Sequence, residues 1–215
     1  PLAEKYKEKT ELHIVQCVCG RKFASIMKIH SMNHLNNTFL VAMPSMHETW
    51  FNQSVILICD HEPDSTMGIV LNKPMGMQLG ELFEQLDIPC DDMNLKGIPV
   101  YKGGPVQVER GFVLHSSYRD AAGTTKIGED LYLSTSREVL VDIAQGNGPD
   151  RFFVALGYAG WGENQLADEI CANAWLNASS NNDLIFDLPI HYRWEEAVKE
   201  IGFDIKHISS AVGHA

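Results

Sequence analysis

The run RFFVALGY, residues 151–158, decides the fold class of this chain. After Arg151 it contains apolar and aromatic residues almost without interruption. A strand whose side chains are apolar on both sides of the pleat is buried on both faces of its sheet. The run therefore predicts a central β-strand with other parts of the chain packed over both faces.

Shorter runs of β-branched and aromatic residues before this strand predict further strands. The predicted strands are residues 38–43, 54–60, 67–73, 97–103, 110–116 and 130–136. A short polar loop, residues 61–66, separates the second from the third and favours a hairpin. Strands are thus expected to pair locally, with neighbours in the sequence.

Apolar residues at helical spacing predict helices among and after these strands. The predicted helices are residues 80–88, 135–146, 165–176 and 192–201. In the second, Thr135 and Glu138 have the spacing of a capping box, and Gly146 is expected to end the helix. Helices are interspersed among the strands without regular βαβ alternation, so the predicted fold class is α+β.

The composition is that of a globular protein, with 45% hydrophobic and 21% charged residues in a chain of 215. There are 17 basic and 28 acidic residues, which give a formal net charge of −11. An acidic protein repels nucleic acid and anionic lipid unless its cations gather in one place. Direct nucleic-acid binding is therefore disfavoured. A membrane partner is not expected either, because no apolar run approaches the roughly 20 residues of a membrane span.

The cysteines and histidines predict neither a metal site nor a cofactor. Five cysteines, an odd and sparse set, indicate reduced thiols and a cytoplasmic protein. Cys59 and Cys171 lie on predicted apolar elements and are expected in the core, whereas Cys90 is expected at the surface. The nine histidines show no metal-ligand spacing, and CDHEPD, residues 59–64, is predicted to be a solvated hairpin loop.

Residues 1–31 differ from the rest of the chain in charge. They carry six basic and three acidic residues, whereas residues 32–215 carry 11 and 25. We expect the first segment to be a disordered extension that arises from an upstream start or a tag, and residues 32–215 to form a single domain. Cys17 and Cys19 are a weak metal-binding signal, because no second pair of thiols accompanies them.

The stretch YKGGPVQVERGFVLH, residues 101–115, is the first candidate site. Gly103 and Gly104 lack the lysine and hydroxyl of a phosphate-binding loop and lead into an extended run rather than a helix. With the proline after them they suit a tight corner, since glycine tolerates positive φ and proline fixes its own φ. The functional alternative is a site that includes Arg110. His115 follows five residues later, so these two side chains are expected on opposite faces of a strand.

A second candidate is GYAGWG, residues 157–162, which follows the central strand and precedes a predicted helix. It is not the nucleophile elbow of a hydrolase, because Ala159 stands at the serine position and Trp161 at that of the second glycine. Two interpretations stay open. Either Tyr158, Gly160 and Trp161 line an anion site where the helix begins, or Trp161 packs over the edge of the sheet.

The third candidate is STSRE, residues 134–138, at the start of another predicted helix. Capping accounts for Thr135 and Glu138. It does not account for Arg137, because a cation near the positive end of a helix is mildly unfavourable. With Thr135 and Ser136 it either binds an acidic group of a ligand or partner, or it pairs with a neighbouring carboxylate.

Several motifs occur in order along the chain: NTFLVAMPSM, MGIVLNKP, GGPVQVERGFVLH, LSTSRE, VALGYAGWGENQLADEICANAWL and the final GHA. In these motifs, and over residues 32–215, it resembles the bacterial YqgE/AlgH-type family. The resemblance implies a small cytosolic α+β protein with a large mixed β-sheet flanked by a few helices. It implies no established enzymatic activity and, for one branch, a genetic link to transcriptional control of exopolysaccharide synthesis. Ala159 departs from the serine that is common there, which argues against a hydroxyl-dependent role.

Three functional hypotheses remain open. The first is a non-catalytic cytosolic module that binds an unknown protein or a small anionic ligand in regulation, because no catalytic constellation is complete. The second is a small-anion or metabolite sensor, or an enzyme, whose site joins Gly103, Gly104, Arg110, Arg137 and residues 157–162. The third is a direct DNA-binding regulator, which the acidic charge disfavours.

Overall fold

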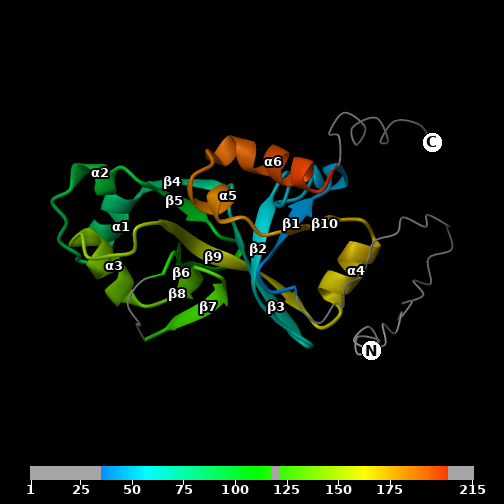
Figure 1. Cartoon of the computed structure of the whole chain (residues 1–215), viewed down its shortest axis with the longest axis horizontal. Helices are drawn as coiled ribbons and strands as arrows, with labels where there is room; N and C mark the ends of the chain where they lie inside the picture. The colour runs from blue at the N-terminus through cyan, green and yellow to red at the C-terminus, as the bar shows by residue number, and fades with distance from the viewer. Residues whose placement is uncertain (1–34, 118–121, 203–215) are drawn as a thin grey trace, which may run out of the picture. The chain divides into compact units, whose positions relative to one another are not determined.

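The computed structural model describes residues 35–117 and 122–202, and all of them belong to one compact unit, Ser31–Ala215. Its frame is a curled sheet of ten strands (Figure 1). The strands are β1 Thr38–Ala42, β2 Val55–Glu62, β3 Ser65–Val70, β4 Pro74–Gln78, β5 Pro99–Lys102, β6 Val106–His115, β7 Thr124–Gly128, β8 Leu131–Ser134, β9 Phe152–Gly162 and β10 Trp175–Ser179.

The strand order along the sheet is β10-β1-β2-β3-β9-β6-β8-β7, with β5 also paired to β9 and β4 to β5. Every pairing is antiparallel except β5 with β9, which is parallel. The sheet is therefore mixed, and the α+β fold class is confirmed.

Short helices cover the sheet in separate groups (Figure 1). They are α1 Leu79–Gln85, α2 Met93–Lys96, α3 Arg137–Ala144, α4 Gln165–Cys171, α5 Asn182–Phe186 and α6 Arg193–Glu200, with 3₁₀ turns at Pro44–Met46 and Ile190–Tyr192. Each group packs on its own apolar cluster of buried side chains. Helices α5 and α6 pack on the inner cluster, which includes Phe39 and Phe153. Helices α1 and α3 pack on the α1–α3 cluster, which includes Phe83 and Val154, and α4 packs on a third cluster, which includes Ile56 and Trp161.

Strand β9 lies at the centre of the sheet, as its apolar run predicts. It pairs with β3, β5 and β6 and contributes side chains to all three clusters. Phe153 and Ala155 face the inner cluster, as alternate residues of a strand do, but the next residue to face it is Tyr158 rather than Gly157. The alternation of side chains therefore shifts by one residue at Gly157. Gly157 has φ of +75°, a conformation that favours glycine and marks a bulge.

The predicted hairpin is confirmed and is tighter than expected. β2 and β3 pair as far as Glu62 and Ser65, so only Pro63 and Asp64 form the turn. The predicted solvated loop at residues 59–64 is therefore wrong before Pro63, where all four residues belong to β2.

The predicted capping box is wrong, although the helix is present as α3. The backbone is still extended at Ser136, with ψ of 147°, and the Ser136 side chain makes no capping hydrogen bond. Glu138 is consequently the second residue of the helix rather than the third, where a capping box needs it. Gly146, with φ of +74°, lies just beyond the helix end as expected.

The helix predicted over residues 165–176 is wrong beyond Cys171. Asn173 has φ of +58°, and the chain then enters β10, which pairs with β1. Trp175 and Leu176 are buried in separate apolar clusters on the two faces of β10, which favours a strand over a continued helix. The strands β4, β7 and β10 were not predicted, since the first begins with proline at an edge and the second is polar.

Two of the cysteine predictions are wrong. Cys171 is exposed at the end of α4, whereas Cys90 is buried against the α1–α3 cluster. Cys59 is buried as expected, and burial raises the pKa of its thiol far above the ordinary value. The predictions for residues 1–31 and for the final GHA lie outside the described residues.

Candidate functional site

Gly103 and Gly104 lie directly against strand β9. The Gly103 amide donates to the Leu156 carbonyl at 2.8 Å, and a Cβ on Gly103 would lie 2.2 Å from the Gly157 oxygen. A Cβ on Gly104 would lie 1.9 Å from the Tyr158 carbonyl carbon. Both positions require glycine because two backbones meet there, which supports the structural interpretation of this corner.

A wide bulge follows this corner in β6. Val106 pairs with Tyr158 and Gly111 with Leu156, so residues 107–110 stand opposite Gly157 alone. The extra residues project into solvent, and Val108 is 53% exposed. Bulges re-aim side chains, often beside binding sites.

Arg110, the last residue of the bulge, has weak internal contacts. Its guanidinium carbon lies 5.3 Å from the centroid of the Phe112 ring, and its Nη1 donates to Gln107 Oε1 at a long 3.4 Å. No carboxylate of the described residues forms an ion pair with it. His115 is buried on the opposite face, as the spacing predicts, where Nε2 lies 2.8 Å from Ser134 Oγ.

Arg110 borders a groove of about 410 Å³ beside the β3–β9 ladder. We call it the Arg110 groove, and its lining residues are Ser65, Thr66, Met67, Val106, Arg110, Tyr158, Gly160 and Trp161. Four of the residues singled out in the sequence therefore meet here. The groove combines one cation with apolar and aromatic surface and three residues that carry a hydroxyl, Ser65, Thr66 and Tyr158.

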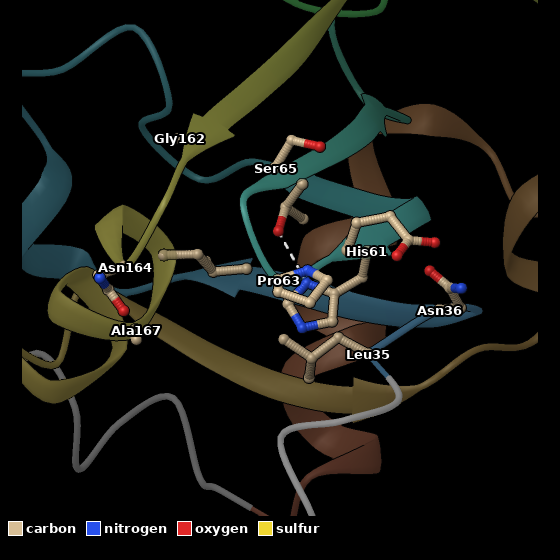
Figure 2. A pocket seen from close by; sticks show the side chains of 11 residues that line it. Leu35, Asn36, His61, Pro63, Ser65, Gly162, Asn164 and Ala167 are labelled. Carbon is tan, nitrogen blue, oxygen red and sulfur yellow. Dashed lines mark hydrogen bonds between the residues drawn. The ribbon is translucent and has the colours of Figure 1, made fainter.

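A larger pocket of about 560 Å³, the hairpin pocket, adjoins the groove through Ser65 and Thr66, which line both. It lies between the β2–β3 hairpin and the segment that joins β9 to α4, and Figure 2 shows His61 and Leu35 on one side of it and Asn164 on the other. His61 Nδ1 lies 2.7 Å from Thr66 Oγ1. No single sequence motif marks this pocket, because its walls come from segments far apart in the chain.

The expected strand-to-helix turn at residues 157–162 is wrong. These residues are strand throughout, and α4 begins only at Gln165, after Asn164 with φ of +60°. Tyr158, Gly160 and Trp161 therefore do not surround a helix start. The groove is formed instead along the flank of the strand.

Trp161 is 5% exposed and has a polar anchor that the sequence motifs did not predict. Its indole Nε1 donates to Glu169 Oε2 at 2.9 Å, and Trp175 Nε1 donates to the same oxygen at 2.7 Å. Gln165 donates to the other carboxylate oxygen at 3.0 Å. Two tryptophans six and eight residues from one glutamate were the available signal.

Arg137 belongs to a different region. Its Nη2 donates to the carbonyls of Leu86 at 2.6 Å and Asp87 at 3.3 Å, at the end of α1. A cation suits the negative end of that helix, which explains a residue that the start of its own helix does not. Neither the groove nor the hairpin pocket is lined by Arg137, Thr135 or Ser136, so the single joined site of the second hypothesis, which needs Arg137 beside Arg110, does not form.

Metal-binding chemistry finds no support in the part of the chain that the structure describes, where no three His, Cys, Asp or Glu residues are grouped to hold an ion. In the same part, none of the helices has the length and apolar character needed to cross a bilayer.

Comparison with known proteins fits this fold. A family model described as AlgH-like matches residues 39–206. The chain belongs to the AlgH-like family. A UPF0301 protein of Shewanella sp. (strain W3-18-1) is 45% identical over 187 residues, which are 86% of this chain and all of the relative. One from Nitrosococcus oceani is 40% identical over 185 residues, 86% of this chain and 99% of the relative.

Two solved structures resemble the chain. The solution structure of AlgH from Pseudomonas aeruginosa has 39% identity and a TM-score of 0.72, and the match covers 88% of this chain and all of AlgH. A crystal structure from Corynebacterium diphtheriae has a TM-score of 0.64 at 19% identity, over 83% and 92% of the two chains, and shares the fold. These comparisons give the AlgH-like family no molecular function.

Proposed function

We propose that this AlgH-like protein is a non-catalytic binding module of the cytoplasm, and that a small anion with an apolar body lies in its Arg110 groove. The observation that supports the proposal most is the state of Arg110. In a chain with 28 acidic and 17 basic residues, this cation borders a groove and has no ion-pair partner among the described residues.

The walls of the groove favour a ligand with an apolar part. Met67, Val106 and Tyr158 provide apolar contact area, and the Phe112 ring lies behind the guanidinium. Sites for small molecules commonly combine apolar walls with a few polar groups that fix the orientation of the ligand. One carboxylate or phosphate group paired with Arg110 would supply that orientation.

The arrangement of polar groups supports binding rather than catalysis. Two contacts among the described residues join a hydroxyl to an imidazole: Ser134 with His115, which are both buried away from the groove, and Thr66 with His61. Thr66 is only 6% exposed and stands opposite Trp161 in the β3–β9 ladder, so its hydroxyl is poorly placed to attack a substrate. Burial of the hydroxyl is the feature that argues against nucleophilic catalysis here.

Native mass spectrometry of the full chain, compared with the denatured sample, is the first test. We expect a mass excess that disappears on denaturation and is absent from Arg110→Gln. Lys126→Gln removes an equal charge from β7 and should keep the excess. A titration with hexanoate, followed by NMR shifts of residues 65–67, covers the case of a ligand lost during purification. Unchanged shifts together with a bare mass would refute the proposal.

We propose further that any regulatory role runs through this ligand or a protein partner rather than through DNA. The net charge of −11 opposes contact with the extended phosphate backbone of a DNA duplex. Duplex binding at low salt that weakens steeply as salt is added would contradict this part of the proposal.

A further inference from the structure

We infer that a second site, formed by Trp50, Lys73 and Lys102, binds a nucleotide, with its base against the indole and its phosphates between the two lysines. We call this surface the lysine–tryptophan patch. It lies outside the Arg110 groove and shares no residue with it.

The two lysines face each other across neighbouring segments. The Lys102 amide donates to the Lys73 carbonyl at 2.8 Å, and the next residues, Pro74 and Tyr101, form the first pair of the β4–β5 ladder. Residues directly opposite in an antiparallel pair project from the same face of the sheet. Lys73 Nζ also donates to the Asn52 carbonyl at 3.1 Å, a contact to the loop before β2. Like charges directly opposite each other destabilise a sheet, so pairing within the sheet does not explain a second lysine at residue 102.

No carboxylate of residues 35–117 and 122–202 forms an ion pair with either lysine. The protein carries more acidic than basic residues, so acidic partners are plentiful in the chain as a whole. Burial, and then the charge of Lys102, lowers the pKa of Lys73. An anion between the two ammonium groups would remove their repulsion.

A third cation stands close behind the patch. The Arg193 guanidinium donates to the carbonyl of Leu71, two residues before Lys73, and lies 5.6 Å from the centroid of the ring of Tyr101, the residue before Lys102. Arg193 is 3% exposed and cannot reach a ligand at the surface. Its charge adds to the positive potential at the patch, because buried charges are weakly screened.

Trp50 gives the patch its aromatic part. Its side chain is 39% exposed, and Lys73 Nζ lies 5.6 Å from the centroid of its ring. The ring is held edge-to-face against Phe51, which in turn packs on the buried Trp175. An indole fixed in this way beside two ammonium groups suits a flat aromatic base that carries phosphates.

The probe for the test is ADP, titrated into the full-length protein and followed by tryptophan fluorescence. We expect saturable quenching, since Trp161, Trp175 and Trp194 are at most 8% exposed and the signal at the surface comes from Trp50. A matching set of NMR shifts should centre on residues 50–53, 73 and 102. Addition of salt should weaken the binding, because the patch is at the surface.

Variants separate the two halves of the site. Lys102→Gln should weaken ADP binding about tenfold, the loss of one charge-assisted contact. Trp50→Leu should weaken binding of ADP and leave that of inorganic pyrophosphate unchanged. Lys126→Gln removes the same charge elsewhere and should bind ADP normally, as should Arg110→Gln, which keeps this result distinct from the test of the Arg110 groove.

Two results would overturn the inference. One is the absence of any saturable change with ADP in either fluorescence or NMR. The other is equal ADP binding by Lys102→Gln and Lys126→Gln. Binding of a single-stranded oligonucleotide without binding of ADP counts against a nucleotide site in the same way.

Discussion

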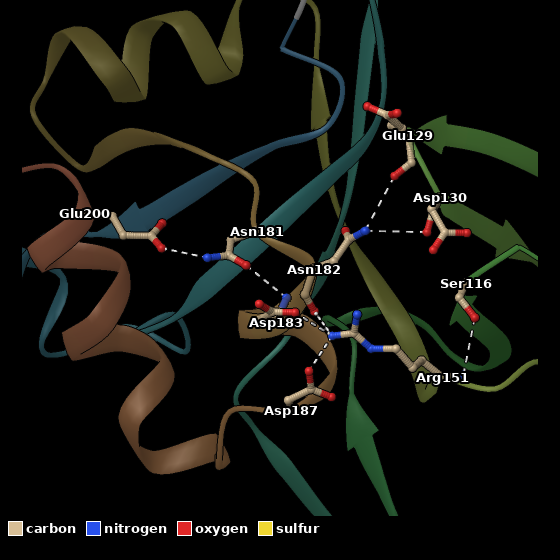
Figure 3. Close-up of polar contacts among 9 residues, drawn as sticks. All are labelled: Ser116, Glu129, Asp130, Arg151, Asn181, Asn182, Asp183, Asp187 and Glu200. Carbon is tan, nitrogen blue, oxygen red and sulfur yellow. Dashed lines mark hydrogen bonds and ion pairs between the residues drawn. The ribbon is translucent and has the colours of Figure 1, made fainter.

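The arginines near the two ends of strand β9 differ in whether they form ion pairs. Near the start of the strand, Arg151 forms ion pairs with Asp183 and Asp187 (Figure 3). Its guanidinium carbon also lies 5.0 Å from the centroid of the Phe186 ring. Near the far end of the strand, Arg110 borders a groove with one long hydrogen bond and no acidic partner among the described residues. The ion-paired Arg151 fastens α5 to the sheet, and Arg110, which has no ion pair with the described residues, is available to a ligand.

Arg193 is the arginine with the most complete set of internal contacts. It is almost fully buried, donates to the carbonyls of Leu188 and Leu71, and lies 5.3 Å from the Phe153 ring centroid. Burial lowers the pKa of its guanidinium, and the aromatic rings and carbonyls compensate the charge. Stability and binding are thus assigned to different arginines, which makes the difference testable by the same substitution at each.

Arg193→Ala should show the largest effect, a loss of about 4 kcal/mol in the free energy of unfolding, because it leaves a cavity and two unpaired carbonyls. Urea denaturation measures it. Arg110→Ala, the matched control, should change stability by less than about 0.5 kcal/mol because it is at the surface. Similar losses of unfolding free energy for the two variants would mean that Arg193 and Arg110 do not differ in their contribution to stability.

Gly104→Ala should come next, with a loss of about 3 kcal/mol from the forced separation of two backbones. The control is Gly162→Ala, since a Cβ on Gly162 meets nothing within 4 Å. The variant also tests the groove, because displacement of Tyr158 would alter one of its walls. A Gly104→Ala protein as stable as the Gly162→Ala protein would show that the close approach of the corner to β9 is not required.

The sequence predicted the centre of the sheet well and the arginines poorly. Burial of a strand on both faces is encoded in its own composition, as residues 151–158 demonstrate. The environment of an arginine depends on residues distant in sequence: Arg193 meets Leu71 and Phe153, neither of which lies near it in the chain. The bulge at Arg110 could not be predicted either. A bulge is defined by the pairing of two strands, and the residues of β6 alone do not show that four of them stand opposite a single residue of β9.

Glu169→Gln should have a moderate effect of about 1–2 kcal/mol, because it replaces the charged acceptor of two indole N–H groups by a neutral one. Asp168→Asn, at the exposed neighbouring residue, is the control. The indole N–H signals of Trp161 and Trp175 should both shift in NMR spectra of Glu169→Gln, and neither should shift in spectra of Asp168→Asn. A shift of one indole alone would mean that the two do not share the carboxylate.

His115, near the start of β9, should give the smallest effect, a dependence of the free energy of unfolding on pH. Burial lowers the pKa of His115, whose ring lies 2.8 Å from the Ser116 carbonyl oxygen next to Arg151. Below the ordinary histidine pKa of about 6.5, the unfolded chain then binds a proton that the folded chain does not, so stability should fall with decreasing pH by at most about 1.4 kcal/mol per unit. Urea denaturation between pH 5 and 8 should show a shallower fall for His115→Gln than for the wild type. His191→Gln, at an exposed histidine, should keep the wild-type slope, and equal slopes for all three proteins would mean that His115 stays able to bind a proton in the folded state.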